Sequence, residues 1–478
     1  MKRLILLMVA ILPGLIMAQP SGSWSLEDCI NYALTNNVDI KQQMLNIQYA
    51  ETDLTQSKLD MLPDLNGYVS HGYNWGQTID RYSNEFATTR VRSNNLYLSS
   101  TVVLFNGLQK FNTIKRTQLD LMATQYNVDK FMDDVSINIA TYYLQILYNM
   151  ELLGIAEAQL DISAQQVSRT QKLVEAGTLA KGDLLLIESQ AATEELNVVN
   201  VQNSLDLSYL ELTQLLDLPS PVGFDIEIPD LSGISIPETP LSPDQIYEIA
   251  LGTQPDIKSA ELGVQSAEKT LALARGTMSP NLYISASFGT GYSGLATEGV
   301  DEVIIPNPLI GTTAGGENVY SIQDYVTYES YETKSFNDQL SDNANETVML
   351  NLNIPIFNGW IVRSNISRAK IGIENAEYTL ELTKLRLRKI IQQAYADAVA
   401  AVKSYDAAEK KVVATSEAFK YAEQKFNVGL INSVEYNESK KDLTLAQAQL
   451  LQAKYDYIFK TTVLDFYMGK PLTLANLD

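Results

Sequence analysis

Residues 103–107 are VLFNG, and residues 355–359 are PIFNG. An alternating polar and apolar segment precedes each Phe-Asn-Gly triplet, and a long proline-free stretch with apolar residues every seven positions follows it. A period of two predicts a β-strand, and a sustained heptad predicts a coiled-coil helix. Asn and Gly suit a point where the chain leaves β geometry. We therefore predict two strand-to-helix junctions, formed by Phe105, Asn106, Gly107, Phe357, Asn358 and Gly359.

The sequence around these junctions is written twice. SLEDCINYAL (25–34) aligns with SPDQIYEIAL (242–251) at an offset of 217, whereas the junctions align at an offset of 252, so the second copy contains 35 additional residues. Such a duplication fixes the architecture. We predict a first structural repeat (helix, two strands, long helical hairpin) over 19–216, a proline-rich linker over 217–241, a second repeat over 242–472 and a C-terminal tail over 473–478.

Each copy contains two alternating segments of strand character. In the second copy Leu350, Leu352 and Ile354 alternate with Asn351 and Asn353. Strands of about ten residues cross a bilayer when they are tilted. Four strands cannot close a barrel, whereas three chains would supply twelve, and lipid does not tolerate an open strand edge. The pattern alone also permits a soluble domain made of two sheets.

The additional residues of the second copy lie within a predicted long surface loop at about 290–346. The loop begins with GTGYSG (289–294), which matches the G-x-G-x-x-G pattern of dinucleotide-binding proteins. That fingerprint requires a helix directly after it. No helical pattern follows here, so we predict a flexible turn instead.

The heptad pattern runs through both halves of the chain and is broken in each by a glycine. In the first copy the seven-residue spacing covers Ile139, Ile146, Leu153, Leu160, Val167 and Val174. The pattern breaks at Gly177, and at Gly429 in the second copy, and then resumes. A glycine between two heptad helices predicts the tip of an antiparallel hairpin.

The composition excludes several classes of function. Cys29 is the only cysteine and His71 the only histidine, which removes internal disulfides, most zinc sites and His-dependent triads. We expect Cys29 to be buried in a helix and His71 to be a polar strand residue. The formal net charge of −22 at pH 7 argues against binding to a nucleic-acid backbone. We therefore expect no enzyme activity, no metal site and no cofactor.

The N-terminal residues predict export. Lys2 and Arg3 precede an apolar run from Leu4 to Met17, and Ala18 follows it. This pattern is typical of a secretory signal peptide over 1–18. No other segment has 18 consecutive apolar residues, so we predict no transmembrane helix. The exported chain is then periplasmic, extracellular or held in the outer membrane by strands.

Taken together, these features resemble the TolC family of outer-membrane channel proteins over essentially the whole mature length of the chain. The resemblance rests on the duplication, the order of strand pair and long hairpin, the Phe-Asn-Gly junctions and the tip sequence FNVGLINSVEYNES (426–439). It implies a mainly α fold with a membrane β-barrel. In a homotrimer, a twelve-stranded barrel in the outer membrane of a Gram-negative bacterium would continue into an α-helical coiled-coil tunnel across the periplasm.

The resemblance also implies a function. The trimer would be the passive exit duct of a tripartite efflux or type I secretion system and would export drugs, small molecules or polypeptides. An inner-membrane pump of the RND, ABC or MFS type would drive it through a periplasmic adaptor, and outer-membrane lipid would surround the barrel. The alternative is a periplasmic coiled-coil scaffold or adaptor without a pore, which explains the heptads but not the paired strands.

Two sites follow from the resemblance. Val428, Gly429 and Leu430 match the adaptor-docking tip of the family; Ala176, Gly177 and Thr178 form the corresponding turn and depart from that motif. Acidic residues just past the tip match a pore constriction, namely Glu435, Glu438 and Asp183, which in a trimer would form rings of carboxylates that attract cations. Two plainer interpretations stay open, in which the glycines only turn the chain and the acids form a solvated face. Ile431 stands where some members carry an arginine that latches the closed end.

Overall fold

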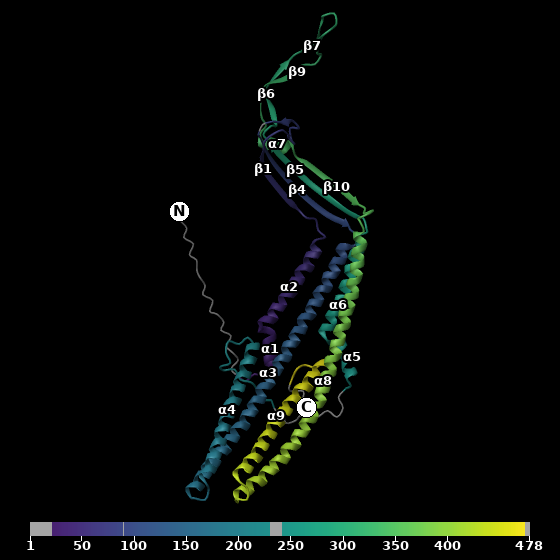
Figure 1. The fold of residues 1–478 in the computed structure, drawn as a ribbon. Helices are drawn as coiled ribbons and strands as arrows, with labels where there is room; N and C mark the ends of the chain where they lie inside the picture. Colours follow the sequence, from purple (N-terminus) through teal and green to yellow (C-terminus); the bar gives the residue numbers. More distant parts are fainter. Residues whose placement is uncertain (1–21, 89, 230–240, 474–478) are drawn as a thin grey trace, which may run out of the picture. The chain divides into compact units, whose positions relative to one another are not determined.

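The computed structural model describes residues 22–88, 90–229 and 241–473. The predicted signal peptide, part of the predicted linker and most of the C-terminal tail lie outside these residues. The described residues are mostly helical, with long strands in each half of the chain (Figure 1). Within them no helix is both long and apolar enough to cross a membrane.

The two halves follow one order of elements. The first half contains α1 (Leu26–Asn36), α2 (Val38–Leu59), β1 (Asn66–Asn74), β2 (Thr78–Ile79), β3 (Phe86–Ala87), β4 (Val91–Phe105), α3 (Gln109–Glu175) and α4 (Lys181–Leu215). The second half contains α5 (Pro243–Thr253), α6 (Pro255–Gly276), β5 (Asn281–Ser293), β6 (Thr297–Ile305), β7 (Leu309–Thr312), β8 (Asn318–Tyr320), β9 (Tyr325–Thr333), α7 (Phe336–Asp342), β10 (Asn345–Asn353), α8 (Ile361–Asn427) and α9 (Ser433–Tyr467).

Equivalent residues start equivalent helices. Ser25 caps α1 and Ser242 caps α5, and each forms a reciprocal capping box with the residue three positions later, Asp28 or Gln245. A capping box satisfies backbone N–H groups that the first helical turn leaves unpaired. The two serines are separated by the offset of the sequence repeat.

Two compact units cut across the sequence repeats. The helical unit contains the described parts of 1–50, 121–263 and 376–478, and the sheet unit contains the described parts of 51–120 and 264–375. Each unit therefore takes residues from both copies of the duplicated sequence.

The sheet unit contains a four-stranded antiparallel sheet in the order β1-β4-β5-β10. β4 and β5 join the two halves of the chain, with Tyr97 opposite Gly289. The register aligns side chains of one kind across the strands. Leu350, Ile284 and Val102 face one way, whereas Thr347, Ser287 and Ser99 face the other. The predicted alternation thus forms one apolar face.

The additional residues of the second half are regularly folded. β5 continues to Ser293, β6 pairs with β9, β7 pairs with β8, and α7 leads into β10. The prediction of a flexible turn at GTGYSG was wrong, because residues 289–293 are part of β5. Close packing accounts for one glycine there. A Cβ atom on Gly291 would lie 1.9 Å from the Tyr82 hydroxyl and 2.4 Å from the Asn94 carbonyl oxygen.

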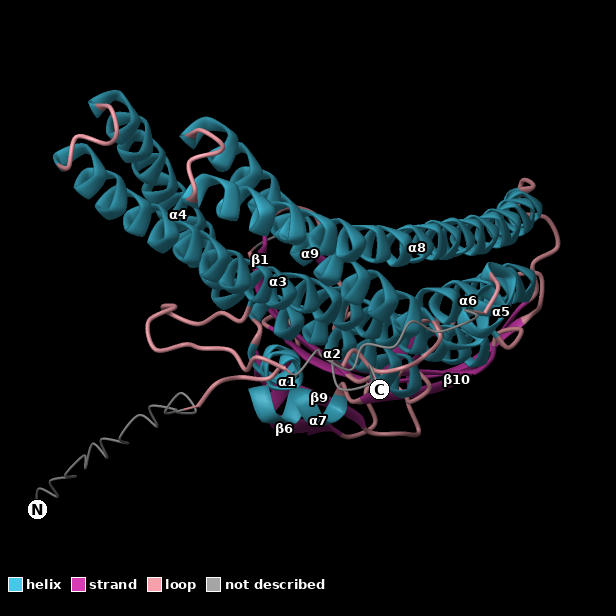
Figure 2. Cartoon of the chain, turned by 90° about the horizontal axis from the view of Figure 1, so that it is seen from below, coloured by secondary structure: helices cyan, strands magenta, loops and turns pink. Residues whose placement is uncertain are grey.

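The helical unit contains two long antiparallel hairpins, α3/α4 and α8/α9, which lie side by side (Figure 2). Ile139 and Ile146 are fully buried on the predicted heptad face of α3, and Tyr405 stacks on Tyr457 between α8 and α9 at 6.0 Å. Cys29 is buried in α1, as predicted. His71 lies in β1, also as predicted.

Candidate functional site

The two predicted junctions share a backbone conformation. Gly107 and Leu108 both have a positive φ, as do Gly359 and Trp360. Only glycine enters this left-handed region without steric cost. At the first junction β4 ends at Phe105, and the Asn106 carbonyl accepts a 2.7 Å hydrogen bond from the Gln109 side chain. At the second junction the strand ends earlier, at Asn353, so Phe357 and Asn358 lie in a connecting segment.

The environments of the two glycines differ. A Cβ atom on Gly107 would lie 2.3 Å from the Gly276 carbonyl oxygen and 2.6 Å from Ser279 Cβ. A Cβ atom on Gly359 would have nothing within 4 Å. Gly107 is therefore required both for the turn and for the close packing of Gly276 and Ser279 against it, whereas Gly359 is required for the turn only.

The two hairpin tips end their first helices in the same way. Gly177 and Gly429 have φ angles of 74° and 76°. Thr178 N–H donates to the Leu173 carbonyl at 2.9 Å, and Leu430 N–H donates to the Lys425 carbonyl at 2.8 Å. This is the Schellman arrangement, in which a left-handed glycine lets the chain satisfy the last helical carbonyls.

The side chains at the two tips differ. Val428 and Leu430 are 72% and 75% exposed. Ala176 and Thr178 are also exposed but present little apolar surface. The apolar side chains nearest the first tip, Leu173 and Leu179, are 36% and 37% exposed, so the second tip offers the more exposed apolar pair.

Asp183 and Glu435 lie in the first turns of the returning helices, and Glu438 lies one turn further along α9. Glu435 and Glu438 are exposed on α9, and Asp183 is half-buried on α4. Within the described residues no hydrogen bond or ion pair joins Asp183 to either glutamate. Within one chain the structure brings together the two glutamates only, as near neighbours on one helix.

Glu435 also supports the N-cap residue of its own helix, Asn432, a role that the sequence analysis missed. Asn432 accepts a 2.9 Å hydrogen bond from the Glu435 backbone N–H and donates a 3.1 Å hydrogen bond to the Glu435 carboxylate. The Asn-x-x-Glu spacing is close to a capping box and could have revealed this role.

A buried lysine joins the two hairpins, and the sequence analysis missed it too. Lys440 on α9 is 4% exposed, and its ammonium donates to the Gln159 carbonyl at 2.9 Å and to the Ser163 hydroxyl at 2.7 Å, both on α3. Burial lowers the pKa of Lys440, and the negative charge of Glu194 opposes that effect. Lys440 follows the heptad residue Tyr436 by four positions, which places it on the same buried helix face.

Nearer the tips, two further contacts connect the hairpins. The Arg169 guanidinium donates to the Asn427 side chain, and the Gln166 amide lies 3.4 Å from the Tyr436 hydroxyl. Together with Lys440 these contacts hold α8/α9 against α3/α4 within one chain.

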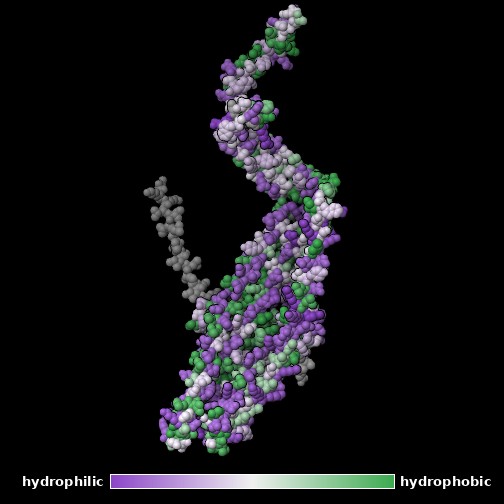
Figure 3. All heavy atoms as spheres, viewed as in Figure 1, coloured by the Kyte–Doolittle hydropathy of each residue, from purple (hydrophilic) through white to green (hydrophobic). Residues whose placement is uncertain are grey.

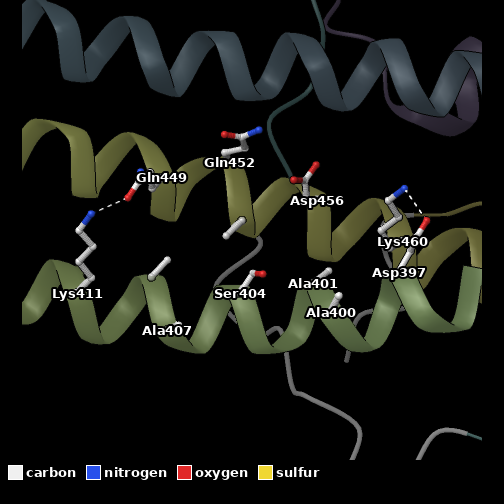
Figure 4. A pocket seen from close by; sticks show the side chains of 12 residues that line it. Asp397, Ala400, Ala401, Ser404, Ala407, Lys411, Gln449, Gln452, Asp456 and Lys460 are labelled. Carbon is white, nitrogen blue, oxygen red and sulfur yellow. Dashed lines mark hydrogen bonds and ion pairs between the residues drawn. The ribbon is translucent and has the colours of Figure 1, made fainter.

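A groove of about 710 Å³ lies between α8 and α9 (Figure 4). Ala400, Ser404 and Ala407 line it from α8. Polar pairs lie at its ends, Lys411 with Gln449 at 2.8 Å and Lys460 with Asp397 at 3.3 Å. Within the described residues no group of three or more His, Cys, Asp or Glu side chains could hold a metal ion.

Comparison with known proteins identifies the family. Residues 29–217 and 246–470 match the sequence model of the family described as outer membrane efflux protein. The match covers more than half of the chain, which therefore belongs to the outer membrane efflux protein family. The predicted TolC-like character, outer-membrane location and efflux-channel class are confirmed at the level of the family.

Individual relatives are distant but span nearly the whole chain. The outer membrane protein TolC of Escherichia coli K12 is 21% identical over 97% of this chain and 87% of its own length. The alkaline protease secretion protein AprF of Pseudomonas aeruginosa is 23% identical over 95% of this chain and 86% of its own length. The solved outer membrane protein VceC of Vibrio cholerae aligns with a TM-score of 0.71 at 16% identity, over 94% of this chain and 96% of that one. The mainly helical fold with paired strands is thus confirmed.

Proposed function

We propose that three copies of this chain form a closed twelve-stranded barrel in the outer membrane, continued by a helical tunnel across the periplasm. The observation that supports this most directly is the four-stranded sheet. Within the described residues β1 and β10 each pair on one side only, and β10 exposes Val348, Leu350 and Leu352 to solvent. Open edges and an apolar face are both unfavourable in water. Joining β1 of one copy to β10 of the next removes the edges and turns the apolar face to lipid.

The trimer would act as a passive exit duct with no catalysis of its own. An inner-membrane pump and a periplasmic adaptor would supply the energy and the connection, as in tripartite efflux or type I secretion. We assign adaptor docking first to the tip at Val428, Gly429 and Leu430, because its apolar pair is exposed and exposed apolar residues mark interaction surfaces. The tip at Ala176, Gly177 and Thr178 is the weaker candidate.

The remaining proposals concern the N-terminal segment, the segment at 290–346 and the acidic residues near the hairpin tips. We propose that residues 1–18 are a removed signal peptide and that the segment at 290–346 faces the exterior. Glu435, Glu438 and Asp183 would line the narrow periplasmic end of the tunnel. Rings of carboxylates in a constriction favour cations and repel one another.

Single-channel conductance of the purified protein in a planar bilayer tests the duct and the constriction together. The expected result is a small, cation-selective conductance that grows or loses its selectivity in the Glu435→Ala/Glu438→Ala variant. A conducting wild type that is indifferent to the variant would contradict the constriction and leave the duct. A heat-resistant trimer that never conducts would contradict the open duct and favour the pore-less scaffold.

A further inference from the structure

The additional residues of the second half form a projecting ribbon. We call β6, β9, β7 and β8, with their connections (residues 297–333), the ribbon. β6 pairs with β9 from Thr297 opposite Thr333 to Ile305 opposite Tyr325, and the short hairpin β7/β8 continues beyond them. Within the sheet unit the ribbon extends past the ends of β1, β4, β5 and β10 that are remote from the first turns of α3 and α8, which belong to the same unit (Figure 1).

The base of the ribbon is firmly fixed to the sheet. Gln339 of α7 is almost fully buried, and its amide accepts from Ser293 N–H at 2.8 Å and donates to the Ser293 and Lys334 carbonyls, each at 2.9 Å. Lys334 N–H in turn donates to the Ala296 carbonyl at 2.9 Å. A buried amide with its hydrogen bonds made holds its neighbours in one arrangement. These hydrogen bonds therefore fix the position of the base of the ribbon on the sheet.

The outer half of the ribbon exposes large apolar side chains. Ile322 is 98% exposed, and Ile304, Leu309, Ile310, Tyr320 and Tyr325 are all more than half exposed. Figure 3 shows hydrophobic residues gathered towards the far end of the ribbon. Apolar and tyrosine side chains concentrated on an exposed surface mark interaction sites.

The charge of the ribbon has one sign. Between Thr297 and Thr333 the sequence contains seven Asp and Glu residues and no Lys or Arg. A second ribbon would be repelled, and so would the anionic head groups of a lipid surface. A surface with basic side chains would be attracted.

The backbone of the ribbon supplies a template as well. In the described residues β6 and β9 form a two-stranded sheet, so each has one edge without a neighbouring strand. Such an edge can take up an extended peptide through main-chain hydrogen bonds, while side chains give specificity. Insertion of the same edges into lipid would leave their polar groups unsatisfied.

We propose that the ribbon binds an extended polypeptide segment with alternating basic and apolar side chains, which adds as a further strand to a free edge. The apolar side chains of the segment contact the exposed isoleucines and tyrosines, and its basic side chains pair with the acids. This inference goes beyond the proposed duct. Only the position of the ribbon on the cell surface rests on that function; the binding itself does not.

The test uses the purified full chain and a fluorescent peptide of about ten residues in which Lys and Ile alternate. Ile304→Asn/Ile310→Asn removes apolar side chains of the ribbon without changing its charge. Val222→Asn/Ile228→Asn is the matched control, because these residues are similarly or more exposed but lie in the segment after α4. We expect the dissociation constant to rise at least about tenfold in the ribbon variant and by less than about twofold in the control. Salt should weaken binding to the wild type.

A second variant covers the case in which the first fails to fold. Ile305 and Tyr325 face each other, so residues 306–324 can be replaced by an Asn-Gly turn that keeps the register of β6 and β9. This shortened variant should lose most peptide binding and keep the conductance of the wild type. Loss of conductance without loss of peptide binding would count against the shortened variant as an intact duct. Unchanged peptide binding would overturn the docking proposal.

Other outcomes would also overturn it. A peptide with Glu in place of Lys that binds equally well would exclude recognition by charge. Ribbon-dependent binding to phosphatidylcholine vesicles, with or without phosphatidylglycerol, would make lipid the occupant. Concentration-dependent association that disappears in the ribbon variant would make a second copy the occupant.

Discussion

The Asp80 carboxylate accepts a 2.7 Å hydrogen bond from the Ser293 hydroxyl, 213 positions later in the sequence. Both side chains are buried. Asp80 also accepts hydrogen bonds from the Ser83 backbone and hydroxyl and from the Tyr82 backbone. The first copy thus supplies an acceptor to the second copy where β4 and β5 meet, at the base of the ribbon.

Ser293→Ala should loosen this end of the sheet. The variant leaves one oxygen of a buried carboxylate without this donor, which costs about 1–3 kcal/mol. The expected result is faster amide hydrogen exchange at Tyr82, Ser83 and the end of β5. Ser287→Ala on the same strand is the control and should leave exchange there unchanged. Equal effects of the two substitutions would show that the Asp80 contact contributes nothing specific.

Acid should have the same effect as that substitution. Burial raises the pKa of Asp80, but hydrogen bonds from the Ser83 backbone, the Ser293 hydroxyl, the Ser83 hydroxyl and the Tyr82 backbone outweigh it, so the pKa lies below its ordinary value. A lowered pKa stabilises the fold above about pH 4, and this stabilisation is lost as the pH falls further. The protection factor of the Ser83 amide, which corrects for the pH dependence of intrinsic exchange, should therefore fall below about pH 4 in the wild type and change less in Ser293→Ala.

Gly107→Ala should be far more damaging than Gly359→Ala. Both glycines have a positive φ, so both variants pay about 1–2 kcal/mol for left-handed backbone. Only at Gly107 would the new methyl group collide with backbone, at 2.3 Å from the Gly276 carbonyl oxygen, which adds about 1–3 kcal/mol. Urea unfolding followed by Trp fluorescence should give the larger loss for Gly107→Ala. Equal losses would contradict the packing difference.

Asn432→Ala should separate the two roles of Glu435. Removing a helix N-cap costs about 1 kcal/mol, so the amides at the start of α9 should exchange roughly fivefold faster. Glu438→Gln leaves the cap intact and should not change exchange. If Asn432→Ala alters conductance as strongly as Glu435→Ala does, the effect of Glu435 arises from the helix start rather than from its charge in the pore.

The sequence predicts the fold wherever a pattern is periodic and repeated. The heptad residues Ile139 and Ile146 are buried, and Gly177 and Gly429 take the left-handed conformation that a hairpin tip needs. Both copies carry these signals, so each supports the other. The insertion has no counterpart in the first copy. Its glycines suggested a loop. The reason for Gly291, the close approach of Tyr82, depends on tertiary packing and is not visible in the sequence.

The candidate sites were predictable in part, for a related reason. Tip glycines and acids can be located by motif, whereas the Lys440 contacts with Gln159 and Ser163 join residues more than 270 positions apart. Its position on the heptad face was visible, but the partner helix was not. Lysine also favours exposure, so composition gave no reason to place it inside.

Asp133→Asn should stabilise the protein at alkaline but not at acidic pH. Burial raises the pKa of Asp133 to about 6; Lys130 lowers it, and Asp129, Asp134 and Asp256 raise it further. An acid with a raised pKa favours the fold below about pH 4, and this contribution is lost as the pH rises through about 6. Because the side chain is only half-buried, the gain in Asp133→Asn at pH 8 should be about 1–2 kcal/mol. Thermal unfolding should show a Tm raised by a few degrees at pH 8, no change at pH 4, and no pH-dependent difference in the exposed control Glu157→Gln. A shift of equal size at both pH values would mean that the substitution acts through packing and not through the charge of Asp133.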